Sequence, residues 1–288
     1  MNARAARETA VKRSLGFSCG LIATLATLLP VDLVVAQQTP ADAPSPAPAV
    51  EAVPVSAPAE VTKTLQAMDE AASQQQMKRL LRFYSPEFSN SDGLNRQSMK
   101  LAIKDFWDKH QDLSYKTELL SWKADPQGGG IATTKTTITG NSTVADRKMA
   151  LTATINSQQR WLNQQMVNQT ITAEESQLVS GNTPPKVKVN LPNEVKVGET
   201  FNFDVIVSEP LDERLLLGTA VEESISAENY LKQPVLTLEL LPAGGLFKVG
   251  QAPKKPTNEW ISAVLVQDGG MIMISRRLMV VQHKSKAN

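Results

Sequence analysis

The hydrophobic period of this chain changes once, near His110, from about 3.6 residues to 2. Before this point apolar residues recur at helical spacing, and after it they alternate with polar residues as they do in strands. Helices are therefore expected first and an antiparallel meander after them. This order favours an α+β layout, in which a curved sheet wraps around the helices.

Three helices are expected before His110. The first covers the residues up to Ser73, with its apolar stripe at Val61, Leu65, Met68 and Ala72. Ser73 and Gln76 have the spacing of a capping box, so a second helix is expected to start there and to end at Pro86. Asn95 is expected to cap a third helix that ends near His110.

Four strands are expected after His110. In the first, the alternation changes phase at Leu119 and Leu120, as a β-bulge would produce. The turn that follows contains Gly128, Gly129 and Gly130. The expected strands cover residues 113–122, 131–139, 148–162 and 165–178.

Pro184 and Pro185 mark a boundary, after which the chain shows only short strand-like stretches. Asp268-Gly269 is a strong signal for a hairpin between the last two. Short strands at this spacing, without a long helical pattern, indicate an all-β sandwich. The expected strands cover residues 187–191, 195–197, 201–207, 214–221, 234–241, 259–267 and 271–281.

The N-terminal residues 1–36 are expected to be a signal peptide. Four basic residues precede an apolar run from Leu15 to Leu29, and a small-residue cleavage motif ends at Ala36. The protein is therefore expected to be exported to the periplasm or the extracellular space. The alternative is an uncleaved membrane anchor, which Pro30 and Asp32 disfavour.

Residues 37–60 contain six prolines and seven alanines and are expected to be a disordered linker. The α+β domain is then assigned to residues 61–181 and the β-sandwich to residues 182–283. Residues 284–288 are expected to be a disordered tail.

Composition excludes several classes of function. The formal net charge is +1, which gives no electrostatic basis for nucleic-acid binding. Cys19 is the only cysteine and leaves with the signal peptide, so neither a disulfide nor a thiolate site is expected. The two histidines, His110 and His283, are too few for a His-based metal cluster. No metal and no cofactor are expected.

Residues 61–181 resemble the nuclear transport factor 2-like (NTF2-like, or SnoaL-like) superfamily. The resemblance rests on the stretch 83–88, the Ser91-Asp92-Gly93 turn and the strands around Trp161 and Glu174. The stretch 195–201 resembles early strands of bacterial immunoglobulin-like domains. Together these imply a cone-shaped domain of helices and a curved antiparallel sheet, followed by an immunoglobulin-like sandwich. By family analogy, a homodimer is also expected.

The resemblance also supplies a candidate site. In members similar to ketosteroid isomerase a general-base Asp lies in the turn after the second helix, and Tyr84, Glu87 and Asp92 fall in that pattern. Asp92 beside Gly93 equally fits an ordinary turn. The aromatic residues in this region are candidates to line a ligand cavity, although they equally fit a packed core. The candidate ligand-binding residues are Tyr84, Asp92, Trp107, Tyr115, Trp122 and Trp161.

The expected function is an exported, non-enzymatic binding or assembly protein of the cell envelope. Its partners would be a small apolar ligand or another envelope protein, and the membrane only if the signal is uncleaved. One alternative is an isomerase- or dehydratase-like enzyme that uses Asp92 as its base, which a cavity of roughly 300 Å³ with Asp92 at its wall would support. The other alternative is a purely structural spacer.

Overall fold

The computed structural model describes residues 57–126, 128–144, 147–211, 214–232, 236–241 and 244–282. The expected signal peptide, most of the expected linker, His283 and the expected tail lie outside these residues. The elements up to residue 181 are α1 (Ala59–Ser73), α2 (Met77–Leu80), the 3-10 helix η1 (Leu81–Phe83), β1 (Tyr84–Asn90), α3 (Arg96–Lys109), β2 (His110–Ala124), β3 (Gly130–Val144), β4 (Arg147–Leu162) and β5 (Gln165–Gly181).

The elements after residue 181 are strands and one 3-10 helix. They are β6 (Val187–Asn190), β7 (Glu194–Lys196), β8 (Thr200–Val207), β9 (Leu216–Ser224), η2 (Asn229–Leu231), β10 (Glu239–Leu240), β11 (Gly245–Gln251), β12 (Thr257–Gln267) and β13 (Gly270–Val281). Among the described residues, no helix is long and apolar enough to cross a membrane.

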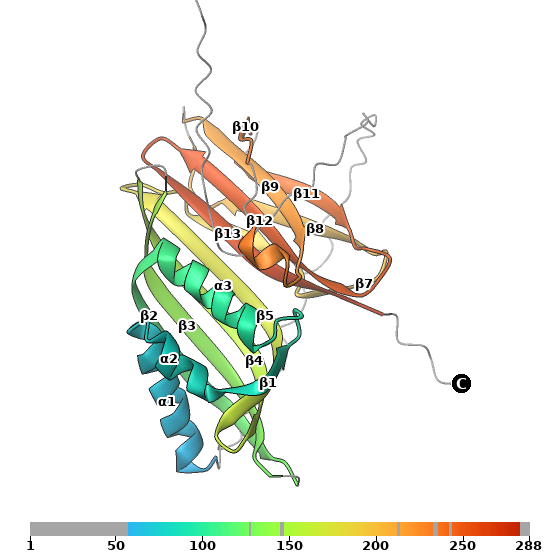
Figure 1. Ribbon diagram of the computed structural model, residues 1–288. Coiled ribbons are helices and arrows are strands. Elements are labelled where there is room, and N and C mark those ends of the chain that lie inside the picture. Colours follow the sequence, from blue (N-terminus) through green and yellow to red (C-terminus); the bar gives the residue numbers. More distant parts are fainter. Residues whose placement is uncertain are drawn as a thin grey trace, which may run out of the picture.

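A single ten-stranded sheet crosses the expected domain boundary. Its order is β10-β9-β12-β13-β5-β4-β3-β2, with β1 parallel beside β5 and β7 parallel beside β13. The other pairs are antiparallel. A second sheet has the order β11-β8-β6. In Figure 1 the long strands run diagonally across the molecule, with α3 in front of them and α1 beside the edge strand β2.

The expected fold, a cone-shaped NTF2-like domain followed by a separate immunoglobulin-like sandwich, is therefore wrong. The structure is mostly antiparallel sheet, and β5 does not end the first sheet. Gly270 to Arg276 of β13 pair with Gly181 to Glu175 of β5, so the hydrogen-bond ladder continues into the second half of the chain. The strands expected to form one face of an independent sandwich instead extend the first sheet.

Two hydrophobic cores lie on opposite faces of this sheet. Successive side chains of β13 point to opposite faces, so Met271 and Met273 contact the core under the helices, whereas Ile272 and Ile274 contact the second core. The second core is completed by Phe203 and other apolar residues of the three-stranded sheet. β13 is therefore shared by both cores and cannot be assigned to one half of the molecule.

Several local expectations are confirmed. Asn95 caps α3, and its side chain accepts hydrogen bonds from Gln97 N and Ser98 N, both at 2.9 Å. The expected bulge near Leu119 appears as a shift of register between β2 and β3. The hairpin at Asp268-Gly269 joins β12 to β13, with φ of +89° at Gly269.

Two local expectations are wrong, and one strand has no counterpart among the expected elements. Ser73 does not begin a helix but ends α1, and its hydroxyl accepts a hydrogen bond from Tyr115 N at 2.9 Å. The stretch from Tyr84, expected to be the end of a helix, forms β1 beside β5. The edge strand β11 was not expected, because Gly245 and Gly250 interrupt its alternation.

Candidate functional site

A cavity of about 240 Å³ lies between α1, α3 and the inner face of β2 to β5. Most of its wall is aliphatic or aromatic, because the apolar stripes of both helices face the sheet here. Several wall residues of α1 and α3 are only partly buried, so the wall is in contact with solvent. The wall includes Leu65, Met68, Ile103, Phe106, Ile138 and Ile155.

A carboxylate lies on the wall where α1 contacts β2. Asp69 Oδ2 accepts a hydrogen bond from Thr117 N and Asp69 Oδ1 accepts one from the Thr117 hydroxyl, both at 2.6 Å. The hydroxyls of Thr117 and Thr136 are 3.0 Å apart. Burial raises the pKa of Asp69, and the two hydrogen bonds from Thr117 act in the opposite direction.

A second polar part of the wall is fully hydrogen-bonded. The side-chain amide of Gln159 donates to Thr134 Oγ1 at 3.1 Å and to Ser157 Oγ at 3.2 Å. Its carbonyl accepts from Trp161 Nε1 at 3.1 Å. These groups satisfy one another beneath the cavity, so Gln159 is held in one orientation.

The second half of the chain completes the cavity. Tyr230 of η2 and Trp260 of β12 belong to the wall, as does Glu174 of β5. Glu174 Oε2 accepts from Trp260 Nε1 at 3.1 Å and from Arg277 Nη2 at 2.8 Å. The cavity therefore depends on contacts between residues more than 80 positions apart.

Asp92 lies behind this wall and not on it. Its two carboxylate oxygens accept from Arg277 Nη1 and Nη2, each at 2.8 Å, and both side chains are completely buried. The Tyr230 hydroxyl also donates to Asp92 Oδ2. Burial alone would lower the pKa of Arg277, but the charges of Glu174 and Asp92 raise it overall. Asp92 is thus buried, is not part of the described wall, and has its carboxylate held by Arg277 and Tyr230, which is typical of a structural ion pair.

The candidate ligand-binding residues fall into two groups. Tyr84 and Tyr115 line the cavity. Trp107 donates from Nε1 to the Tyr115 hydroxyl at 3.1 Å but is not part of the described wall. Trp122 and Trp161 pack in the core under the helices and are also absent from the described wall.

The structure adds wall residues that the sequence reasoning missed. Asp69 follows Leu65 by four residues, so both side chains lie on the inner face of α1. This spacing of a carboxylate within the apolar stripe is the sequence signal that could have identified Asp69 as a wall residue. Tyr230 and Trp260 could not be identified in this way, because they lie far from α1 and α3 in the sequence and no local pattern places them beside these helices.

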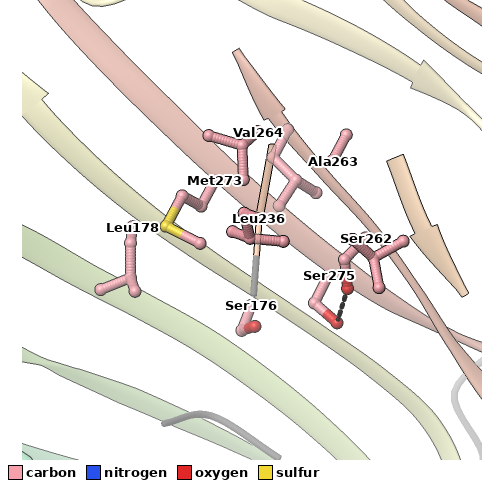
Figure 2. Close-up of a pocket in the computed structure, with 10 residues that line it drawn as sticks. Ser176, Leu178, Leu236, Ser262, Ala263, Val264, Met273 and Ser275 are labelled. Atoms are coloured by element: carbon pink, nitrogen blue, oxygen red, sulfur yellow. Dashed lines mark hydrogen bonds between the residues drawn. The ribbon is translucent and has the colours of Figure 1, made fainter. Parts of the chain in front are cut away.

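A smaller pocket of about 30 Å³ lies on the same face of the sheet, where β5, β13 and β12 meet. Figure 2 shows the Ser262 and Ser275 hydroxyls hydrogen-bonded to each other, with Leu236 lying over the strands. Ser176 belongs to the walls of both pockets. The space accommodates about one water molecule, so it is not a ligand site.

Two buried acids lie further along the sheet. Glu223 of β9 pairs in register with Trp260 of β12, and both of its carboxylate oxygens lack a hydrogen-bond partner among the described residues. Burial and the charge of Glu259 raise the pKa of Glu223 to about 8. Burial also raises the pKa of Glu259, to about 7.

Comparisons with known proteins add little about this site. Residues 182–281, about a third of the chain, match a domain of unknown function, DUF8623. No curated protein matches the chain.

Among solved structures, the chain is similar to Bd1075 from Bdellovibrio bacteriovorus, with 12% identity and a TM-score of 0.24. The similarity covers 39% of this chain and 38% of that protein, so this chain spans well under half of its length. At that score the likeness carries no weight for fold or function.

Proposed function

We propose that this chain is an exported binding protein for a small, mostly apolar molecule, which occupies the cavity between α1, α3 and the sheet. The observation that carries the proposal is the cavity of about 240 Å³ with a predominantly apolar wall. A cavity of about 150 Å³ can hold benzene, and typical sites for drug-sized ligands begin near 300 Å³. The ligand is therefore larger than benzene and smaller than most drugs.

The polar groups of the wall support binding over catalysis. Gln159 is fixed by three hydrogen bonds, and Glu174 is held by Arg277 and Trp260. A few fixed polar groups in an apolar wall orient a ligand. The residue proposed as a general base, Asp92, lies outside the wall. The N-terminal residues 1–36 support export.

The test is thermal unfolding of the full chain with small aromatic and alicyclic compounds, with indole and naphthalene as first probes. A ligand at about 100 times its Kd adds roughly 2.7 kcal/mol to the free energy of unfolding, which corresponds to a rise in Tm of about 5–10 °C. Ala153→Phe, which fills the cavity, is expected to abolish the rise.

The matched control is Ala150→Phe on the same strand. Ala150 is exposed, whereas Ala153 is 6% exposed and lies on the wall, so the control adds the same ring outside the cavity. We expect the Ala150 variant to keep the ligand-induced rise in Tm. If no probe raises the Tm, or if the Ala153 variant still responds, the proposed function is wrong.

A further inference from the structure

On the described wall of the cavity, the charged side chains are all acidic. Its described wall includes three carboxylates, those of Asp69, Asp105 and Glu174, and no Lys, Arg or His. An anionic ligand would find no cation on this wall. A ligand that carries a carboxylate or a phosphate is therefore disfavoured.

Two of the three carboxylates already have a cationic partner. Asp105 accepts from Lys109 Nζ at 2.6 Å, one turn along α3. Glu174 accepts from Arg277 at 2.8 Å. Neither Lys109 nor Arg277 belongs to the described wall. Lys109 supplies a full positive charge to Asp105, whereas the single charge of Arg277 is shared between Glu174 and Asp92. Both wall carboxylates nevertheless have a cationic partner without ligand.

Asp69 takes part in no salt bridge among the described residues. Its partners are the backbone N–H and the hydroxyl of Thr117, which use one acceptor position on each carboxylate oxygen. A carboxylate can accept about four hydrogen bonds, so each oxygen has capacity for a further donor.

The charge of Asp69 is not needed to hold the edge strand. Ser73, one helical turn further along α1, accepts the backbone N–H of Tyr115 at 2.9 Å with a neutral hydroxyl. Accepting the backbone N–H of Thr117, two residues further along β2, therefore requires only a hydrogen-bond acceptor and not a charge. A half-buried negative charge without a cationic partner is costly, and a cationic ligand would remove that cost.

We propose that the ligand is an apolar molecule that carries a protonated amine, and that Asp69 binds the amine. This inference rests on the proposed function, because it concerns the same cavity. The ammonium group donates to the free acceptor positions of Asp69, while the apolar part contacts the aliphatic and aromatic side chains of α1, α3 and the sheet.

The experiment compares three probes of similar shape by calorimetric titration of the full chain at neutral pH: 2-phenylethylamine, 2-phenylethanol and phenylacetate. We expect the amine to bind at least about tenfold more tightly than the alcohol, since hydrogen bonds between charged groups exceed neutral ones by this margin. Phenylacetate is expected to bind least.

The decisive variant is Asp69→Asn, which keeps an acceptor for Thr117 N and removes the charge. It is expected to reduce the preference for the amine over 2-phenylethanol to less than about threefold. Asp108→Asn is the control, because Asp108 is exposed on α3 and pairs with Lys104. If the Asn variant does not fold, Asp69→Ser is the second variant, because a serine hydroxyl already accepts a backbone N–H of β2 at position 73.

The outcomes separate the two proposals. Equal binding of amine and alcohol, or a preference that survives in the Asp69 variants, overturns the amine inference and leaves the proposed function standing. Failure of all three probes, with no response to indole or naphthalene, overturns both. A preference for the amine that disappears only in the Asp69 variants supports both.

Discussion

The side chains of Asp92 and Arg277 form an ion pair that is completely removed from solvent. Asp92 lies in the turn before α3, and Arg277 lies on β13, 185 residues away in the sequence. A buried pair of this kind adds little net free energy over apolar side chains, but losing one partner is costly because it leaves an uncompensated charge. We therefore expect the pair to act mainly on how the two halves of the chain meet.

Replacing Arg277 with Met is therefore expected to be severe. It leaves Asp92 and Glu174 without their cation, and we expect a loss of about 3–5 kcal/mol in the free energy of unfolding, measured by urea denaturation. The control is Arg276→Gln on the same strand, whose partly exposed pair with Glu175 should cost about 1 kcal/mol or less. Similar losses of stability in both variants would show that burial of the Arg277 ion pairs is not the cause of the loss.

Glu223 makes stability depend on pH in a defined direction. Its pKa is 4.5 when unfolded and about 8 when folded, so the folded state holds a proton that the unfolded state releases. The contribution of Glu223 to stability is therefore fully present below pH 4.5, falls as the pH rises from 4.5 towards 8, and is lost above 8. We expect Glu223→Gln to raise the free energy of unfolding by a few kcal/mol at pH 9 and to change it little at pH 5.

Urea denaturation at unit steps from pH 5 to 9 measures this difference. The exposed Glu118 of β2 supplies the control, since Glu118→Gln should leave the pH profile unchanged. A Glu223→Gln profile that runs parallel to that of the wild type would show that Glu223 does not retain its proton.

Among the secondary-structure elements, α3 depends most clearly on a local sequence signal. Asn95 and Ser98 form a complete capping box, with Asn95 N donating to Ser98 Oγ at 2.9 Å. Because α3 forms one wall of the cavity, the stability of this cap also affects the proposed binding site.

Asn95→Ala is expected to lower the free energy of unfolding by about 1 kcal/mol, since the N–H groups of Gln97 and Ser98 lose their acceptor. Asn95→Asp keeps the acceptor and should stay close to the wild type. Chemical denaturation of the three proteins measures the difference, and an equal loss in both variants would show that the cap itself is not the cause.

For the molecule as a whole, the continuous sheet should make unfolding cooperative. β13 pairs with β5 and contributes to both cores, so neither half keeps its packing when the other unfolds. We expect a single calorimetric transition for the full chain. Two resolved transitions would show that the halves are independent domains.

Removal of residues 182–288 is expected to leave an unstable remainder. The edge of β5 would lose its partner, and Asp92 and Glu174 would lose Arg277. An exposed strand edge promotes association between chains. Size-exclusion chromatography should therefore show aggregates for this truncation, whereas a monomeric, folded fragment would contradict the role assigned to β13.

How much of the structure the sequence predicts depends on the range of the interactions. Asn95 as a cap, the bulge near Leu119 and the hairpin at Gly269 all result from residues a few positions apart, and each is correct. β1 was mistaken for the end of a helix because its partner, β5, lies about 80 residues away. Of the candidate site residues, Tyr84 and Tyr115 reach the cavity, and they do so from elements that adjoin it.

Local patterns in the sequence specify α1, α3 and the long strands after His110, together with the signals that start and end several of these elements. Periodicity and capping act over a few residues, so they can be recognised without the fold. The continuation of the sheet from β5 to β13 and the pairing of Asp92 with Arg277 become apparent only in the folded molecule. Strand pairing and buried ion pairs join distant residues, and the alternation of a strand does not specify its neighbour.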